Sequence, residues 1–409
     1  MRIDLKELKV LPSLILIVFV LQAAFDFNAI HMLTASYAML ALVLVGALCS
    51  FFLILRQRTI TLLDMLYMVF MTIIAVSSLA HGTDFRHWVY FCFSICLLRF
   101  FFNFYQDRLS MLIIAMTIGF SLAAMIQLYQ LVTHPDMWII RENNADTGYI
   151  LGGNYNQIGV RLLVTLILNM LCTKINRKFV FLLIPIAVIC IIMPLMVGSM
   201  TSVASIILFI LICFIPSLRL RRLSVVVMLT AIAFFQIFVC FNGKGIENND
   251  FMVWFVEDVL GKDITFTNRT HMWDASLRVT AESPIWGYGF PDKTWYNSQM
   301  TSYATGSHNF ILAILLFGGI PTMMLYLYFL FTSFFRTLRI RDYWADCIII
   351  GISILCMMML MEFYPVPIVF TFLILAEYYP QLHQQLAEKT QTSTNIKPYN
   401  KYETSEVGN

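Results

Sequence analysis

Charged residues are scarce in this sequence of 409 residues. Asp, Glu, Lys and Arg make up 12% of it and hydrophobic residues 59%, whereas an average globular domain is about 25% charged. A chain this apolar cannot cover its surface with polar groups, so the composition excludes a water-soluble enzyme. It also excludes intrinsic disorder, which requires low hydrophobicity and high net charge. The net charge of +3 is spread between apolar runs, so no nucleic acid partner is expected.

Two further absences narrow the class of protein. The nine cysteines all lie in or at the edge of apolar runs, and the long polar stretches contain none. Neither a disulfide framework nor a metal site is therefore indicated. No internal repeat is visible, which weakens the case for a transporter built from paired halves.

Long apolar runs are what the sequence has in abundance. About twenty apolar residues cross a bilayer once, so the composition allows roughly ten to twelve crossings. Backbone groups cannot stay unpaired in lipid, so these runs must be helices. We predict an all-α integral membrane protein with about twelve transmembrane helices, at residues 10–26, 36–55, 60–80, 87–105, 110–132, 155–173, 179–197, 201–217, 224–241, 309–335, 344–362 and 366–379. Only Gly198-Ser199-Met200 separates the seventh and eighth runs, which form either two spans or one broken hairpin.

The positive charges predict the orientation in the membrane. With a cytoplasmic N-terminus, 19 of the 27 Lys and Arg residues fall on the cytoplasmic side. The other eight are Arg86, Arg141, Arg161, Lys244, Lys262, Arg269, Arg278 and Lys293. Both termini of this multi-pass membrane protein are then cytoplasmic.

Two outward segments, 133–154 and 242–308, are longer than the other connections. We expect four parts: spans 1–9 in residues 1–241, a large outward loop with helices in 242–308, spans 10–12 in 309–380, and a disordered cytoplasmic tail in 381–409. The loop lies between spans 9 and 10 and is the only segment long enough for helices of its own outside the bilayer.

The outward loop contains a predicted helix from Thr270 to Glu282, which Pro284 ends. Arg269 stands at its start without an obvious acidic partner in the nearby sequence, which favours an anionic ligand. Asp274 and Arg278 are four residues apart, so an ion pair between them is the preferred interpretation of Arg278.

The loop ends at His308, where the tenth span meets the outer surface. A neutral imidazole accepts a proton near neutral pH, as a general base must. Taken alone, His308-Asn309 is also explained as a cap on a membrane helix.

Several short motifs follow one another in a characteristic order on the outward side. They are Arg269, Trp273, Pro284-Ile-Trp-Gly-Tyr-Gly, His308-Asn309-Phe and Gly318-Gly319. This order resembles the O-antigen ligase and O-antigen polymerase superfamily over roughly residues 266–322. The remainder of the chain resembles it in topology only.

The resemblance implies a bacterial membrane glycosyltransferase with a GT-C-like fold. It implies a glycan donor on undecaprenyl pyrophosphate, a sugar hydroxyl as acceptor, and no metal or other cofactor. His308 would act as the base in a direct, inverting displacement, and Arg269 would neutralise the pyrophosphate. Trp273 and Asn309 would belong to the substrate-binding region.

Three other arginines are candidate substrate-binding residues. Arg161 lies inside the sixth span, where a charge by default marks function, although it can also snorkel to the headgroups. Arg141 lies on the shorter outward segment. Many members of the superfamily carry an Arg near the start of the eighth span, but the stretch 198–202 has none. Arg161 or Arg278 is expected to replace it.

Three functions remain open. The first is a polymerase that joins lipid-linked repeat units of O-antigen or capsule, with a chain-length regulator as a further partner. The second is the ligase that transfers finished glycan to the lipid A core of lipopolysaccharide. The third is a flippase or transporter, which favours charges near the bilayer midplane, whereas this chain places its candidate charges at one outward face.

Overall fold

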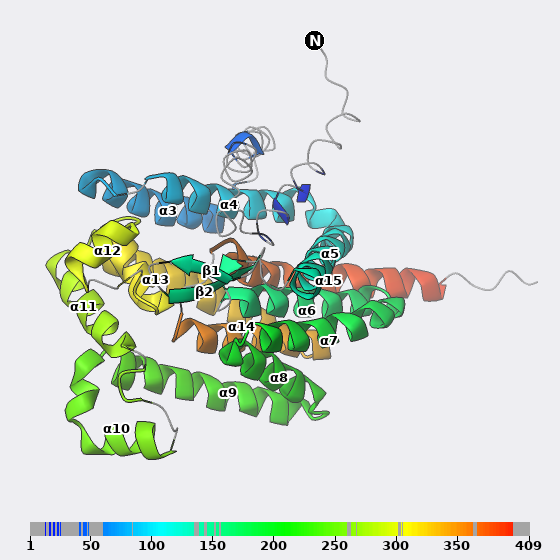
Figure 1. Cartoon of the computed structure of the whole chain (residues 1–409). Coiled ribbons are helices and arrows are strands. Elements are labelled where there is room, and N and C mark those ends of the chain that lie inside the picture. Colours follow the sequence, from blue (N-terminus) through cyan, green and yellow to red (C-terminus); the bar gives the residue numbers. More distant parts are fainter. Residues whose placement is uncertain are drawn as a thin grey trace, which may run out of the picture.

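The structure is a computed structural model of a helical membrane protein. It describes residues 60–395 apart from 84, 135–138, 143–144, 151–152, 155–156, 260–262, 267, 302–303, 305 and 363–365, and scattered positions between 13 and 48. The long helices run side by side, and the shorter ones gather at one end of the bundle (Figure 1). The long helices are α3 (Leu62–His81), α4 (Phe85–Phe104), α5 (Leu109–Thr133), α6 (Ile158–Ile175), α7 (Val180–Met196), α8 (Met200–Phe214), α9 (Leu218–Phe235), α13 (Phe310–Leu338), α14 (Tyr343–Met359) and α15 (Val366–Asn395).

Each predicted span from the third onward coincides with one of these helices. In the described part of the chain, six are long and apolar enough to cross a membrane, and α8 and α14 are shorter apolar helices. The prediction of an all-α membrane protein is thus confirmed. The first two predicted spans, 10–26 and 36–55, fall mostly outside the described residues.

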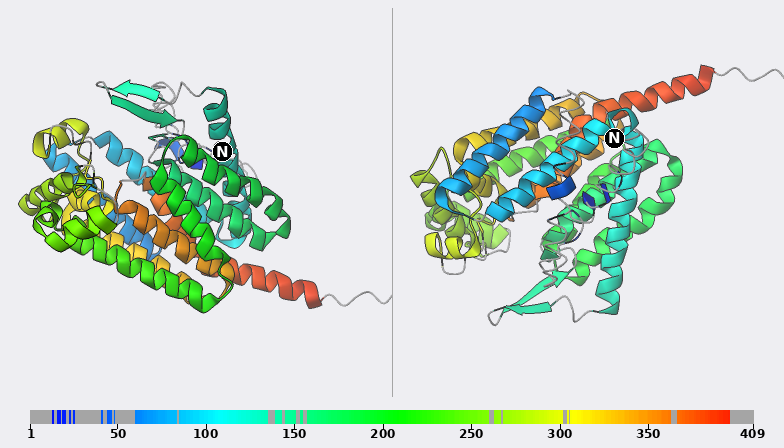
Figure 2. Two further views of the ribbon diagram at one scale, coloured as in Figure 1. Left: turned by 60° about the horizontal axis from the view of Figure 1, so that its bottom comes forward. Right: turned by 90° about the horizontal axis from the view of Figure 1, so that it is seen from above.

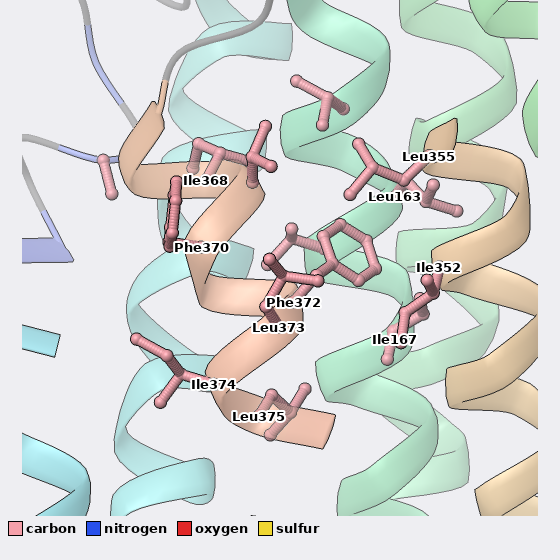
Figure 3. Packing of buried hydrophobic residues seen from close by; sticks show 14 of the residues in the cluster. Leu163, Ile167, Ile352, Leu355, Ile368, Phe370, Phe372, Leu373, Ile374 and Leu375 are labelled. Carbon is pink, nitrogen blue, oxygen red and sulfur yellow. The ribbon is translucent and has the colours of Figure 1, made fainter. Parts of the chain in front are cut away.

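Helix α6 lies at the centre of the bundle. It is buried over 83% of its length, whereas the segments that contain α7 and α9 are buried over only 28% each and present apolar side chains outward. Figure 3 shows Leu163 and Ile167 of α6 beside Leu355 of α14 and Phe372 of α15. A Cβ on Gly351 of α14 would lie 2.2 Å from Ile167, so this contact requires a residue without a side chain.

The seventh and eighth runs form two separate helices, α7 and α8. They meet at Gly198, whose φ of +71° lies in the left-handed region that glycine adopts without strain. The backbone therefore turns sharply between them.

A small antiparallel sheet lies in the shorter outward segment and was not predicted. Its strands are β1 (Ile139–Glu142), β2 (Ala145–Ile150) and β3 (Gly153–Asn154), paired in that order. Both views of Figure 2 show β1 and β2 projecting beyond the helices between α5 and α6. Strand pairing satisfies the backbone groups of a segment too polar to enter the bundle.

The C-terminal segment differs from the expectation. The prediction of disorder from residue 381 is wrong for residues 381–395, because α15 continues through Pro380 to Asn395. Packing stabilises this extension, since Leu382 is 1% exposed and Leu386 packs against the core. Residues 396–409 lie outside the described part.

The acid–base pairs of the bundle are concentrated at the end opposite the large loop. Arg99 of α4 pairs with Asp64 of α3 and Glu377 of α15. Arg221 and Arg222 at the start of α9 share Asp346 of α14 at 2.9 Å. These ion pairs join α4 to α3 and α15, and α9 to α14, and so hold neighbouring helices together at this end of the bundle.

A four-residue cluster ties α6, α14 and α15 at the same end. The carboxylate of Asp342 accepts from Lys174, from the Tyr379 hydroxyl at 2.8 Å, and contacts His383 Nδ1 at 2.8 Å. Burial alone raises the pKa of Asp342, but the hydrogen bonds from Lys174, from the N–H of Ala345 and from Tyr379 outweigh burial and hold this pKa below its ordinary value.

We predict that Asp342→Asn destabilises the fold by about 1–3 kcal/mol, because it leaves partly buried donors without their charged acceptor. Thermal unfolding of the purified protein in detergent measures the change. Asp107→Asn is the control, since Asp107 is exposed in the short turn η2 (Gln106–Arg108). Equal melting temperatures for the two variants would contradict a structural role for the cluster.

Candidate functional site

The outward loop folds into short helices at one end of the bundle. They are α10 (Asp250–Trp254), α11 (Arg269–Glu282) and α12 (Lys293–Gln299), with the turns η7 (Gly243–Asn248) and η8 (Phe255–Val259). In Figure 1 they lie at the left, on the side opposite the C-terminal end of α15. Helix α11 packs against the start of α13, which brings its first residues to the place where the loop ends.

Two of the candidate residues meet at one carboxylate. Glu362 follows the end of α14, and its Oε1 lies 3.1 Å from Nδ1 of His308. The other oxygen, Oε2, lies 3.7 Å from Nη2 of Arg269. The three side chains are partly buried, with 14% of Glu362, 23% of Arg269 and 25% of His308 exposed. A site with one base, one cation and one acid thus forms from three separate segments.

Two nitrogen atoms of this cluster lack a hydrogen bond among the described residues. Nδ1 of His308 is buried and has no aligned hydrogen bond among the described residues, despite its distance of 3.1 Å from Glu362. Nε of Arg269 is also buried without a partner there. The remaining contact of the guanidinium is a long one, 3.4 Å from Nη1 to the carbonyl of Phe266. Donors are therefore available for a further group.

His308 is held in an unusual backbone conformation. Its φ of +46° lies in the left-handed region, which is costly for a residue with a Cβ. The next residue, Asn309, begins α13 as its cap, and Ser307 donates to the carbonyl of Asn309 at 2.9 Å. The strain is maintained because both neighbours are fixed.

Asn309 is fully used by the fold. Its side-chain oxygen accepts from the N–H of Leu312 at 3.0 Å. Its amide nitrogen donates to Oε1 of Gln236 at 2.9 Å and to the carbonyl of Leu360 at 3.0 Å. Gln236 begins η6 (Gln236–Cys240), the continuation of α9. Asn309 therefore joins α9, α13 and α14 next to His308, and both N–H groups of its amide are used by the fold.

Trp273 lies in the core under α11. It is 0% exposed and packs with Phe235 and Phe266 at ring-centroid distances of 6.3 and 5.9 Å. Its Nε1 is buried without a partner in the described part of the chain. Trp273 therefore anchors α11 to the core through these ring contacts.

The two glycine motifs interlock in space. The N–H groups of Tyr288 and Gly289 donate to the carbonyls of Leu316 and Phe317 at 2.6 and 3.0 Å, and the N–H of Ile320 donates to Pro284 at 2.8 Å. Gly318 and Gly319 have non-helical backbone angles and kink α13 at this point. The loop thus supplies the backbone partners that the kink removes.

Arg269 and Arg278 have different surroundings from those expected. Glu362 is an acidic partner of Arg269 that the sequence did not indicate. The predicted pair between Asp274 and Arg278 is wrong, because Arg278 is exposed and donates to the carbonyl of Gln299 at 3.5 Å. Asp274 packs against η7: a Cβ added to Gly243 would lie 2.9 Å from the Cβ of Asp274.

Arg161 is buried inside the bundle and does not snorkel outward. It is 5% exposed, and its Nε donates to the carbonyl of Ala23 at 3.2 Å. The side chain of Arg141, on strand β1, lies outside the described part of the structure. In the residues that the structure covers, no group of three or more His, Cys, Asp or Glu could hold a metal ion.

Glu362 is the site residue that the sequence analysis missed. It stands at the outward end of the eleventh apolar run, in the short connection to α15, 54 positions after His308. The feature of the sequence that could have indicated Glu362 is a single acidic residue at the expected outward end of an apolar run. Such residues are rare in apolar runs and mark function by default.

The described residues form a helical membrane protein in which a histidine, an arginine and a glutamate meet beside the short helices of the large loop. Residues 185–327 match the family model described as O-Antigen ligase. The matched segment runs from α7 to the first half of α13 and includes Arg269, His308 and the interlocked glycine motifs. The resemblance noted in the sequence is thereby confirmed, and an O-antigen ligase or polymerase type of membrane function is supported. No curated protein matches the chain.

We predict that Gly319→Ala destabilises the fold by about 2–4 kcal/mol. The new Cβ would lie 2.5 Å from the carbonyl oxygens of Pro284 and Ile285, at a backbone φ of +68°. Thermal unfolding in detergent is the measurement, and Gly306→Ala is the control because its Cβ would meet nothing within 4 Å. Unfolding of Gly319→Ala at the temperature of the control would show that the interlock contributes no stability.

Proposed function

We propose that this chain is a membrane glycosyltransferase that polymerises lipid-linked oligosaccharide repeat units of O-antigen or capsule at the outer face of the inner membrane. The observation that carries the proposal is the meeting of His308 and Arg269 at the carboxylate of Glu362. A base and a cation within reach of one another are what this transfer requires. The family match at residues 185–327 supports the same class of reaction.

His308 acts as the general base in this proposal. Glu362 faces Nδ1, so a small rotation of the ring gives an Nδ1–H donated to the carboxylate and leaves Nε2 as the basic nitrogen. Catalytic hydrogen bonds are often poorly aligned without substrate, as here. Nε2 takes the proton of the acceptor hydroxyl, and the carboxylate of Glu362 stabilises the imidazolium that forms.

Arg269 stabilises the leaving group. As the acceptor oxygen forms its bond to the anomeric carbon, the bond from that carbon to the pyrophosphate oxygen breaks with inversion. The electron pair leaves with undecaprenyl pyrophosphate, and the guanidinium neutralises the developing charge. Among the described residues Nε of Arg269 has no partner, and the contact of Arg269 with Glu362 is 3.7 Å long. Planar bidentate binding of phosphate therefore costs little rearrangement.

The remaining arginines have secondary places in this proposal. Arg278 is exposed on α11, nine residues after Arg269 and so about 13 Å further along the helix. In this proposal it binds the sugar or a phosphate of the donor. Arg161 and Arg278 remain the candidates for the second phosphate-binding cation, and Arg141 is a further candidate for substrate binding.

We predict that His308→Ala lowers transfer activity by about 100-fold or more, because general base catalysis contributes about 10²–10⁴-fold. Arg269→Ala is expected to abolish activity through loss of leaving-group stabilisation. The measurement is a gel of surface polysaccharide from a host that lacks the gene, complemented with each variant. His271→Ala is the matched control, because His271 lies on α11 two residues after Arg269 and contacts Glu247 at 3.6 Å instead of Glu362. Full activity of His308→Ala would show that the base is another group.

The same gel separates the two glycosyl transfers. Single repeat units on the acceptor in the deletion host identify a polymerase. Loss of every unit from the acceptor, with polymer still built on its lipid carrier, identifies the ligase that transfers glycan to lipid A core. An unchanged ladder contradicts both and favours transport of the lipid-linked unit.

We predict that Glu362→Gln lowers kcat by about tenfold to a hundredfold without raising KM for the lipid-linked donor. Gln keeps the volume and can still accept from Nδ1, but it loses a charge-assisted hydrogen bond of about 1.5–3 kcal/mol. KM does not rise because the cation that binds the donor is retained. Steady-state transfer in detergent measures both constants, and Glu257→Gln, exposed on η8 of the large loop, is the control. Equal kcat for the two variants would remove Glu362 from the mechanism.

A further inference from the structure

A cavity of about 290 Å³ lies at the end of the bundle opposite the His308 site. It is formed where α3 and α15 pass the ends of α4 and α13. The residues that line it include Leu62, Leu63, Arg99, Arg336 and Glu377. The mechanism proposed above uses none of them.

Glu377 presents an unsatisfied oxygen in this cavity. Its Oε1 accepts from Arg99 at 2.5 Å, whereas Oε2 is buried and has no hydrogen-bond partner among the described residues. The side chain is only 6% exposed. A buried carboxylate oxygen without a donor is costly, so the site favours a ligand that supplies one.

Arg336 brings a cation to the same cavity. It is exposed near the end of α13, and no ion pair or hydrogen bond of its side chain is found in the described part of the chain. Arg99, by contrast, is already paired with Asp64 and Glu377. Arg336 is therefore the cation available for an anionic group.

The start of α3 adds backbone donors beside Arg336. The capping box between Thr61 and Asp64 satisfies the N–H groups of those two residues. Helix geometry leaves the N–H groups of Leu62 and Leu63 without acceptors inside the helix. Such a helix start binds phosphate through its N–H groups and its dipole.

Apolar surface extends from the cavity along both helices. On α3, Leu62, Met65 and Val69 are 70%, 53% and 48% exposed and recur at helical spacing on one face. On α13, Tyr328, Phe331 and Phe335 are 46%, 53% and 53% exposed and end beside Arg336. In a membrane such surfaces contact acyl chains, so the ligand of the cavity is expected to carry them.

We propose that this cavity binds the headgroup of a zwitterionic phospholipid that has a primary ammonium, such as a phosphoethanolamine lipid. The ammonium donates to Oε2 of Glu377, and the phosphate is bound by Arg336 and the first N–H groups of α3. Two cations, Arg99 and Arg336, balance two carboxylates, Asp64 and Glu377, so the site is neutral and matches a neutral ligand. This inference is independent of the glycosyl transfer proposed above.

The test is lipid binding by the purified, delipidated full-length protein, followed by native mass spectrometry and thermal shift. Phosphatidylethanolamine should bind at least tenfold more tightly than phosphatidylcholine, whose trimethylammonium cannot donate a hydrogen bond to Glu377. Phosphatidylglycerol, which lacks the ammonium, should bind as weakly as phosphatidylcholine. Equal retention of all three lipids would overturn the proposal. So would equal stabilisation by free phosphoethanolamine, which lacks the acyl chains.

Variants assign the two halves of the headgroup. Glu377→Gln should remove the preference for phosphatidylethanolamine over phosphatidylcholine. Arg336→Gln should weaken the binding of both lipids about equally. Because Arg336 is exposed, this variant should leave the fold intact even if Glu377→Gln disrupts it. Arg339→Gln is the matched control, since Arg339 is exposed near the same helix end outside the cavity lining. A loss of binding in the control as large as in Arg336→Gln would contradict a specific site.

Discussion

The side-chain amide of Asn309 fixes the geometry on which the candidate site depends. Its three hydrogen bonds join the first turn of α13, the end of α9 at Gln236 and the end of α14 at Leu360. His308 is the residue before this amide, and Glu362 follows Leu360 by two residues. The distance between base and carboxylate is therefore set by an amide that is 0% exposed. A buried amide costs free energy unless its groups are paired, so the three helix ends have one arrangement that satisfies all of them.

A second constraint positions Arg269 from the other end of α11. The helix ends at Glu282, and Pro284 directly follows in the loop whose backbone is hydrogen-bonded to the kink of α13. At the middle of the helix Trp273 packs between Phe235 and Phe266. With its centre and its end both held against α13 and α9, the first residue of α11 has little freedom. The cation, the base and the carboxylate thus depend on the same two helices of the bundle, although they lie far apart in the sequence.

The sequence predicted the parts of this structure that depend on local pattern. Ten apolar runs became helices, since backbone groups in lipid permit no alternative, and Arg269 and His308 were found by their order within a motif. Glu362 could not be found in this way, because its relation to His308 arises only when the ends of α13 and α14 meet at Asn309. The pair of Asp274 with Arg278 was wrong for a related reason: spacing along α11 allows the pair, but Asp274 packs against η7 and Arg278 donates to the carbonyl of Gln299 instead. The tail was predicted from its polar composition, whereas Leu382 and the cluster around Asp342 extend α15 as far as Asn395.

The two ends of the bundle use charge in different ways. At one end Arg99 is 4% exposed and contacts its carboxylates at 2.5 and 2.7 Å, and Arg221 and Arg222 share Asp346 at 2.9 Å. Removing one partner of such a pair leaves a buried charge, so these arginines are committed to the fold. At the other end the contacts of Glu362 are 3.1 and 3.7 Å, and both His308 and Arg269 keep a buried nitrogen without a partner in the described structure. A charge in an apolar protein is costly wherever it lies, and it is retained either because it is fully paired or because another group completes it. The first description fits the arginines around Asp64 and Asp346. The second fits the cluster around Glu362, which supports the proposal that glycosyl transfer takes place at that end.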